Sequence, residues 1–374
     1  AEAQDSILAG LRGPAVPYVD QAGVIVTVPN DVRPAFKAYG DEAAAKDALA
    51  AGEIAQYYLI PADFLETGRV LAVTEHPSPL AGMTGADVVG FHTNDYTQYF
   101  LRSVKRTLGY NIEQNIIYAG ERLCKADTFP IGIDFARFHD ACMDPKTNQQ
   151  KIKIRKYLPD TKLIFSVDRL DYSKGFLIIF RAYEKFLEQH PEWHFRVVFN
   201  MVVIPSRDNI QEYRDLKTDI EATVGRINGK YGTLDWNPVI YQYKSLIFNE
   251  LVALYSNSDA GLLTPLRDGM NLVAKEYVAA QHERCGMLVL SELTGAAAEM
   301  GEAILVNPSD ISQVADAIYN ALTMPEAEKR RRIDTMTQRL IKYDVFSWAD
   351  DIMRGTDKVR TDRLNFRVRQ INEE

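Results

Sequence analysis

Cysteine is scarce in this sequence. The 374-residue chain has three, Cys124, Cys142 and Cys285, and they are widely separated. This spacing excludes a CxxC metal motif, and the low number excludes the disulfide framework of a small secreted protein. Reduced thiols are typical of cytoplasmic proteins, so we expect a cytoplasmic location.

Long apolar runs are also missing. Hydrophobic residues make up 46% of the chain, but no segment approaches the roughly 18 consecutive apolar residues of a membrane-spanning helix. The first residues, AEAQDS, have neither the basic region nor the apolar core of a signal peptide. We therefore predict no membrane association.

Basic residues are fewer than acidic residues. The chain has 43 Lys and Arg against 51 Asp and Glu, a formal net charge of −8. Nucleic-acid binding depends on a concentrated basic surface, so we expect no nucleic-acid partner. If such a chain binds a phosphorylated ligand, a few local cations and backbone amides must hold it.

Short apolar runs alternate with amphipathic segments in the second half of the chain. This pattern predicts an α/β fold in which helices cover both faces of a parallel sheet. The predicted strands are residues 163–167, 195–204, 239–243, 261–264 and 287–290, and the predicted helices are residues 176–189, 209–227, 249–255, 272–280 and 311–322. A further helix is predicted from Pro325, and we interpret its basic run, residues 329–332, as a solvated face.

The first 70 residues have a different pattern. An Ala-rich helix is predicted over residues 41–51, with short strands at 24–28 and 56–60, and no glycine-rich nucleotide loop occurs there. A strand at residues 87–91 and a helix at 96–108 follow.

The first informative motif is residues 167–175, which read VDRLDYSKG between a predicted strand and a predicted helix. In an open parallel sheet, ligands bind beyond the carboxyl ends of the strands. Arg169 and Lys174 would there offer two cations to a diphosphate, and Gly175 eases the turn into a helix whose N-terminus favours anions. The alternative is a solvated loop in which these cations pair with neighbouring aspartates.

The second motif is residues 264–276, TPLRDGMNLVAKE, again between a strand and a helix. Backbone amides at the start of this helix can point at phosphate oxygens, and they belong to Gly269, Met270, Asn271 and Leu272. Glu276 lies about one turn further along the same face, where it could accept both ribose hydroxyls. Asp268 at the loop tip could accept sugar hydroxyls, although Asp-Gly alone is only a turn signal.

Three other residues are less specific. Arg207 at the end of a predicted strand could contact a phosphate with two hydrogen bonds, or simply begin a surface helix. His76 lies in a stiff proline-rich turn, EHPSP, where functional and purely structural roles are both open, and His92 is interpreted as a loop residue. The sequence has no HExxH or Ser–His–Asp signature, and we predict no metal and no cofactor.

Together these motifs resemble the trehalose-6-phosphate synthase family of retaining glucosyltransferases. The resemblance runs from residue 85 to residue 348. Besides the two long motifs, it includes residues 90–93 (GFHT), 129–134 (FPIGID), 205–207 (PSR), 225–236 (GRINGKYGTLDW), 291–297 (SELTGAA) and 305–308 (LVNP). It implies an α/β fold with two Rossmann-like domains of the GT-B type.

The resemblance also implies a reaction. Glucose would pass from UDP-glucose to glucose 6-phosphate with retention, giving trehalose 6-phosphate. By the resemblance, the catalytic residues would be Arg169 and Lys174 on the leaving diphosphate, Asp268 on the transferred glucose, and His76. The substrate-binding residues would be Gly269, Met270, Asn271 and Leu272 on the diphosphate, Glu276 on the ribose, and Arg207 on the phosphate of glucose 6-phosphate.

The N-terminal 75 residues do not match this family. The Arg-bearing first strand, the glycine-rich loop and the His-Asp-Tyr-His segment that shape the family's acceptor pocket are not found there. Residues 15–70 faintly resemble an extracytoplasmic segment of exporter permeases instead. We predict an atypical segment over residues 1–75, a remnant of the acceptor-side domain over 76–150, a donor-binding domain over 151–345 and a helical tail over 346–374.

The altered N-terminal part leaves two alternatives open. The chain could be a non-catalytic UDP-sugar-binding protein, or a transferase that uses a different acceptor. The sequence also leaves open whether the chain forms a homo-oligomer.

Overall fold

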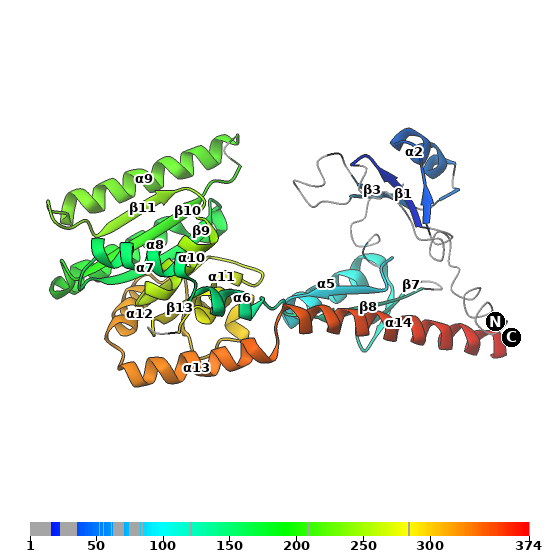
Figure 1. The fold of residues 1–374 in the computed structure, drawn as a ribbon. Coiled ribbons are helices and arrows are strands. Elements are labelled where there is room, and N and C mark those ends of the chain that lie inside the picture. Colours follow the sequence, from blue (N-terminus) through cyan, green and yellow to red (C-terminus); the bar gives the residue numbers. More distant parts are fainter. Residues whose placement is uncertain are drawn as a thin grey trace. The chain divides into compact units, whose positions relative to one another are not determined.

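The computed structural model, drawn in Figure 1, describes most of the chain. The described residues are 16–22, 36–51, 53–54, 56–60, 62, 71–74, 83, 85–119, 122–207, 209–282 and 285–373. His76 and the predicted strand at residues 24–28 lie outside them. The chain divides into two compact units: residues 1–89, 98–126 and 359–374 form the first, and residues 90–97 and 127–358 form the second. The domain boundaries expected from the sequence stay a prediction.

A six-stranded sheet is the centre of the second unit, and all its recorded strand pairings are parallel. Its order is β11-β10-β9-β12-β13-β14. The strands are β9 (Lys162–Arg169), β10 (Val197–Ile204), β11 (Val239–Tyr243), β12 (Ala260–Leu263), β13 (Met287–Ser291) and β14 (Ile304–Val306). From β9 the chain builds outward to one edge, returns to β12 beside β9, and then builds towards the other edge. The strand order therefore reverses between β9 and β12, which is where open α/β sheets bind ligands.

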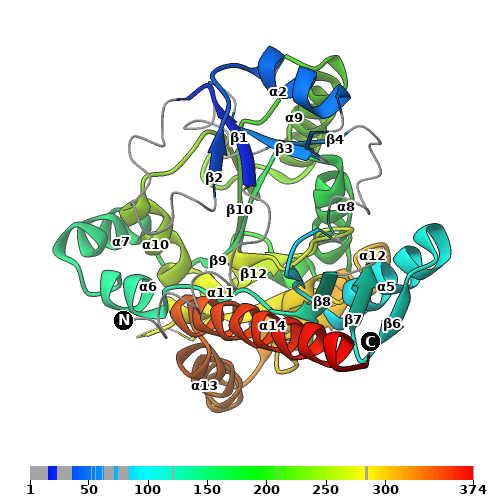
Figure 2. The same ribbon diagram turned by 90° about the vertical axis from the view of Figure 1, so that its right-hand side faces the viewer.

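Helices cover both faces of this sheet, because successive residues of a strand point to opposite sides. Ile164 of β9 packs into one core, whereas Leu163, Phe165 and Val167 pack into the other. Figure 2 shows α8 and α12 on one side of β9, β10 and β12, and α7 and α10 on the other. One face carries α8 (Phe176–Gln189), α9 (Gln211–Tyr231) and α12 (Ile311–Thr323), and the other carries α6 (Phe135–Ala141), α7 (Pro145–Tyr157), α10 (Phe248–Asn257), α11 (Leu272–Ala279) and α13 (Glu326–Lys342).

The predicted strand and helix alternation is confirmed in this unit. The predicted helix at residues 176–189 has the same bounds as α8, and the predicted strand at 239–243 is β11. The interpretation of residues 329–332 as a solvated face is wrong in part. Lys329 is only 3% exposed, because α13 packs against α11, and Arg331 and Arg332 pair with Glu328 at 2.8 and 2.7 Å.

The first unit contains a smaller sheet of order β2-β1-β3-β4. Its elements are β1 (Val16–Asp20), β2 (Phe36–Ala38), β3 (Gln56–Ile60) and β4 (Leu71–Thr74), with α2 (Glu42–Ala50) capped by Asp41. Val19, Leu49, Tyr57 and Leu59 form its core together with Ala45. The predicted helix over residues 41–51 and the predicted strand at 56–60 are therefore confirmed.

Another four-stranded sheet has the order β5-β8-β7-β6. Its strands are β5 (Val88–Phe91), β6 (Asn111–Glu113), β7 (Ile116–Ala119) and β8 (Arg122–Thr128), and α5 (Asn94–Leu108) follows β5. The last element, α14, spans Val345–Glu373. Among the residues that the structure describes, no helix has both the length and the apolar character needed to cross a membrane.

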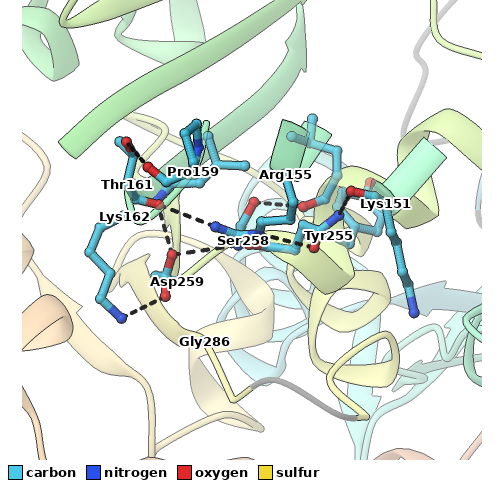
Figure 3. A network of polar contacts seen from close by, with 12 residues as sticks. Lys151, Arg155, Pro159, Thr161, Lys162, Tyr255, Ser258, Asp259 and Gly286 are labelled. Atoms are coloured by element: carbon cyan, nitrogen blue, oxygen red, sulfur yellow. Dashed lines mark hydrogen bonds and ion pairs between the residues drawn. The ribbon is translucent and has the colours of Figure 1, made fainter. Parts of the chain in front are cut away.

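A polar network fixes the amino ends of β9 and β12, opposite the ligand-binding end of the sheet (Figure 3). Asp259, which directly precedes β12, accepts hydrogen bonds from Lys162 Nζ at 2.8 Å and from the Leu163 amide at 2.9 Å. Its own amide donates to the Leu163 carbonyl at 2.7 Å. Arg155 of α7 approaches the same carboxylate to 3.7 Å. Asp259 is 8% exposed, so this carboxylate joins the two central strands in a largely dry environment.

We predict that Asp259→Ala destabilises the fold by about 2–3 kcal/mol, because the buried Leu163 amide loses the Asp259 carboxylate as its acceptor and two cations lose their carboxylate partner. Urea unfolding followed by circular dichroism measures the effect. Asp219→Ala on the exposed face of α9 is the control. A loss below about 0.5 kcal/mol, the size of an ordinary surface substitution, would contradict the role of this network.

Candidate functional site

The sequence motifs lie in loops that leave the carboxyl ends of four neighbouring strands. Residues 170–175 follow β9 and residues 264–271 follow β12, and these two strands pair with each other. Residues 205–210 follow β10, beside β9, and residues 292–297 follow β13, beside β12. The four loops therefore meet at the point where the strand order reverses.

The loops after β9 and β12 are in direct contact. The Ser173 carbonyl accepts hydrogen bonds from the Leu266 amide at 2.7 Å and from the Arg267 amide at 3.3 Å. Lys174 Nζ lies 2.7 Å from Asp268 Oδ2, so a predicted cation of the first loop meets a predicted sugar-binding residue of the second. The structure thus brings the two motifs together, as expected from the sequence.

The first loop is shaped by its own aspartate. Asp171 Oδ1 accepts hydrogen bonds from the amide and hydroxyl of Ser173 at 2.9 and 2.8 Å, which starts the short helix η2 (Tyr172–Lys174). Gly175 then adopts a left-handed conformation, with φ of 66°, before α8 begins. This turn places Lys174 in the interior, 9% exposed, whereas Arg169 at the end of β9 is exposed.

The second loop is organised by Asp268 and Asn271. Asn271 has a left-handed backbone, with φ of 71°, and caps α11 by accepting the Ala274 amide at 3.0 Å. Its side chain also donates to Asp268 Oδ2 at 3.2 Å, while Asp268 Oδ1 lies 3.4 Å from the Met270 amide. The Asp268 carboxylate is therefore surrounded by the Lys174 ammonium, the Asn271 side-chain amide and the Met270 backbone amide.

The loop after β13, residues 292–297, is called the third loop. It supports the second loop through its backbone. The Asp268 amide donates to the Leu293 carbonyl at 3.3 Å, the Gly295 amide donates to the Asp268 carbonyl at 3.2 Å, and the Ala296 amide donates to the Met270 carbonyl at 2.8 Å. A Cβ atom on Gly295 would lie 2.1 Å from the Gly269 carbonyl oxygen. Sequence reasoning singled out SELTGAA only as a family signature, and its packing role was missed.

Helix α11 presents Glu276 on one side and buries Lys275 on another. Glu276 Oε2 accepts the Tyr255 hydroxyl at 2.9 Å, and burial raises the pKa of Glu276. Lys275 is 0% exposed and donates to the Ile131 carbonyl and to Glu299 Oε2, both at 2.8 Å. This buried pair fixes the rotation of α11 and therefore the direction in which Glu276 points.

Arg207 lies in the loop after β10. Its Nη1 donates to the Tyr213 hydroxyl at 2.5 Å and is 3.9 Å from Asp171 Oδ2. The Tyr213 hydroxyl also lies 3.4 Å from Asp171 Oδ2. The side chain of Arg207 is 56% exposed, so its guanidinium is anchored on one side and accessible on the other.

The structure describes His92 but not His76. His92 Nδ1 is 3.3 Å from the Phe129 carbonyl, which fits its interpretation as a loop residue. Its ring also lies beside the second loop, since His92 Cδ2 would be 3.9 Å from a Cβ atom on Gly269. His76 lies outside the described residues, and its predicted role stays a prediction.

We predict that Gly295→Ala displaces the Gly269 carbonyl and the amides that follow it, because a contact of 2.1 Å cannot be accommodated without moving backbone. Affinity for UDP, the nucleotide implied by the resemblance, should fall at least about tenfold, which corresponds to about 1.4 kcal/mol. Isothermal titration calorimetry measures it. Gly301→Ala is the matched control, because a Cβ atom there meets nothing within 4 Å. Equal UDP affinities in the two variants would contradict the supporting role of the third loop.

Comparison with known proteins agrees with this geometry. The family model of glycosyltransferase family 20 matches residues 64–357. A bifunctional trehalose-6-phosphate synthase/phosphatase from Thermoproteus tenax is 48% identical over 274 residues, which cover 73% of this chain and 38% of that protein. A UDP-forming α,α-trehalose-phosphate synthase from Schizosaccharomyces pombe is 40% identical over 295 residues, which cover 79% of this chain and 57% of that protein.

The fold is similar to that of a solved trehalose-phosphate synthase. The crystal structure of a UDP-forming α,α-trehalose-phosphate synthase from Burkholderia xenovorans in complex with glucose-6-phosphate matches with a TM-score of 0.71 and 36% identity, over 74% of this chain and 62% of that one. The predicted α/β fold of the GT-B type is thereby confirmed. The chain spans 38% and 57% of the lengths of the two sequence relatives. With the family model covering most of its length, the chain belongs to glycosyltransferase family 20.

Proposed function

We propose that this chain transfers glucose from UDP-glucose to glucose 6-phosphate with retention, releasing UDP and giving trehalose 6-phosphate. The observation that carries the proposal is the meeting of Lys174 and Asp268 at 2.7 Å, which joins the two motif loops where the strand order reverses. The names of the relatives, UDP-forming trehalose-phosphate synthases, support the same reaction.

The donor would bind where the strand order reverses, at the carboxyl ends of β9 and β12. Arg169 and Lys174 supply two positive charges for the diphosphate, and the amides of residues 269–272 supply hydrogen-bond donors at the start of α11. Glu276, whose carboxylate already accepts the Tyr255 hydroxyl, retains acceptor capacity for the ribose hydroxyls. On donor binding, Asp268 would exchange its contact with Lys174 for a hydroxyl of the glucose.

The chemistry would then depend on electrostatics. As the bond between the anomeric carbon and the diphosphate oxygen breaks, negative charge grows on the leaving phosphate beside Arg169 and Lys174. Such preorganised charge stabilisation is commonly the largest catalytic contribution. The hydroxyl of the acceptor attacks from the same face and gives its proton to the leaving phosphate oxygen, so the new glycosidic bond keeps the configuration and UDP leaves.

The acceptor phosphate would be held by Arg207. Its guanidinium is oriented by the Tyr213 hydroxyl at 2.5 Å and is exposed on its other side, which suits a bidentate contact with a phosphate. Arg207 follows β10 and Arg169 ends β9, and these strands pair in register up to Ile204 and Arg169. The two phosphate-binding cations would therefore lie at adjacent strand ends.

A cytoplasmic location belongs to the same proposal. Among the described residues, Cys124, Cys142 and Cys285 are all buried and none forms a disulfide, and burial raises the pKa of Cys124 and of Cys285 to about 11. Thiols of this kind are unreactive and need no oxidising compartment. Whether the chain forms a homo-oligomer stays open.

UDP release tests the proposed function directly. We expect the chain to release UDP from UDP-glucose only when glucose 6-phosphate is present, and Arg169→Ala to lower this rate at least about 100-fold, the typical loss of one transition-state donor. A coupled UDP assay measures the rate. Arg181→Ala, an exposed arginine on α8, is the control.

The outcome also separates the alternatives. UDP-glucose binding without release under any acceptor would favour a non-catalytic UDP-sugar-binding protein. Release with another sugar but not with glucose 6-phosphate would favour a different acceptor. Unchanged turnover in Arg169→Ala would remove Arg169 from the diphosphate site.

The ribose contact has its own test. We predict that Glu276→Ala lowers affinity for UDP by about 10- to 100-fold, because hydrogen bonds to a charged group contribute about 1.5–3 kcal/mol. Affinity for 2′,3′-dideoxy-UDP, which lacks both hydroxyls, should change less than about threefold by the same reasoning. Calorimetric titration of both nucleotides measures the difference. Equal losses for the two would argue against a ribose role for Glu276.

A further inference from the structure

The Lys174 ammonium lies between two carboxylates, and only one of them has a predicted role. Nζ is 2.7 Å from Asp268 Oδ2 and 3.0 Å from Asp168 Oδ1. Asp268 is expected to contact the transferred glucose. Asp168 is adjacent to Arg169 in the first motif, but neither the sequence nor the proposed reaction assigns it a function.

The two carboxylates are held in different ways. Asp168 belongs to β9, where it pairs in register with Val203 of β10, and its Oδ1 also accepts the Arg169 amide at 2.9 Å. Asp268 lies in the loop after β12, and its partners are loop groups of Met270 and Asn271. Asp168 is therefore held within the central sheet, whereas the Asp268 backbone is held by the loop after β13 and its carboxylate by loop groups and Lys174.

This difference matters when the donor binds. If Asp268 turns towards a glucose hydroxyl, Lys174 loses its nearer counter-charge while it is still only 9% exposed. The donor diphosphate also faces Lys174 at that stage, but it departs with UDP, whereas Asp168 stays. A buried ammonium with less opposite charge around it has a lower pKa, and a neutral lysine cannot stabilise the leaving phosphate. A second carboxylate that does not move would prevent this.

We propose that Asp168 is a positioning residue that keeps the Lys174 ammonium charged and in place while Asp268 engages the sugar. This inference rests on the proposed function, since it concerns the same donor site. It assigns Asp168 no contact with substrate and no proton transfer, so its effect on the reaction passes through Lys174.

The electrostatics of the pair support this assignment. Burial acts to lower the pKa of Lys174, but the charge of Asp168, followed by the hydrogen bond to Asp268, raises it above its ordinary value. Burial also raises the pKa of Asp168, and the charge of Lys174 opposes this rise. Two groups from other elements also face Asp168: the charge of Asp268 raises its pKa, and the charge of Asp168 in turn adds to the raised pKa of the buried Tyr255. Arg169, adjacent in sequence, is exposed and directed to the diphosphate in the proposed reaction.

The test compares the affinity for UDP-glucose, without acceptor, at two pH values in the full chain, because this ligand carries the glucose that engages Asp268. In Asp168→Asn, the pKa of Lys174 should fall, so UDP-glucose binding should weaken at a lower pH than in the wild type. An opposite charge at this distance shifts a pKa by about 1–3 units. For a fall of about two units, the ratio of the UDP-glucose dissociation constants at pH 9.5 and pH 7, measured by calorimetry, should be about tenfold larger in Asp168→Asn than in the wild type.

Two further variants separate positioning from a general loss of structure. Asp168→Glu keeps the carboxylate and should return the ratio towards the wild-type value. Asp219→Asn removes one exposed carboxylate from α9 and should leave the ratio unchanged. Titration of the uracil ring affects all variants equally and cancels in the comparison, and a merely misfolded variant would lose affinity at both pH values alike.

The outcomes distinguish this inference from the proposed function. A wild-type chain that binds no UDP-glucose would overturn both. If the wild type and Asp219→Asn bind UDP-glucose, and Asp168→Asn shows the same ratio as they do, only the role of Asp168 is overturned. A larger ratio that Asp168→Glu fails to reduce would also overturn it, because the carboxylate itself would then not be responsible.

Discussion

The pairing of β9 with β12 is the contact on which the site depends. Gly261 of β12 lies opposite Phe165 of β9, and a Cβ atom on this glycine would be only 2.8 Å from the Phe165 ring and 3.0 Å from the Tyr277 ring. Without a side chain at this position, the strands and α11 pack closely. At the amino ends the Asp259 carboxylate closes the same pair of strands, and at the carboxyl ends Lys174 and Asp268 do so. Polar contacts thus join this buried strand pair at both ends, and the carboxyl end carries the groups of the proposed donor site.

The sequence was sufficient to predict five of the six strands of the second unit's sheet and its two motif loops, whereas β14, α6 and α7 were not predicted. Strand and helix periods in residues 162–322 are strong because both faces of the sheet are covered, and the bounds of α8 were recovered from its apolar spacing alone. The convergence of Lys174 with Asp268 followed from a general property of parallel sheets, in which loops after neighbouring strands meet at one edge.

Other parts of the site could not be found in this way. The third loop acts through backbone hydrogen bonds to residues 268–270, and a backbone contact leaves little trace in side-chain type except at Gly295, where space is lacking. Tyr255 and Tyr213 hold Glu276 and Arg207 from other helices, and such long-range hydroxyl contacts have no local pattern. Asp168 was visible in the motif, but its pairing with Lys174 depends on the η2 turn, which folds the lysine back onto the strand end.

The charge balance of the site bears on how an acidic chain would bind the diphosphate of the proposed donor. The two cations, Arg169 and Lys174, lie near two carboxylates, Asp168 and Asp268, and both carboxylates pair with Lys174, which compensates for its burial. An uncompensated pair of cations would attract any polyanion and would repel each other. With the aspartates present, a diphosphate meets less excess positive charge, and hydroxyls that bind Asp268 would add to the affinity of a ligand that carries both. Selectivity for a nucleotide sugar over inorganic phosphate would then follow from the two carboxylates as much as from the two cations.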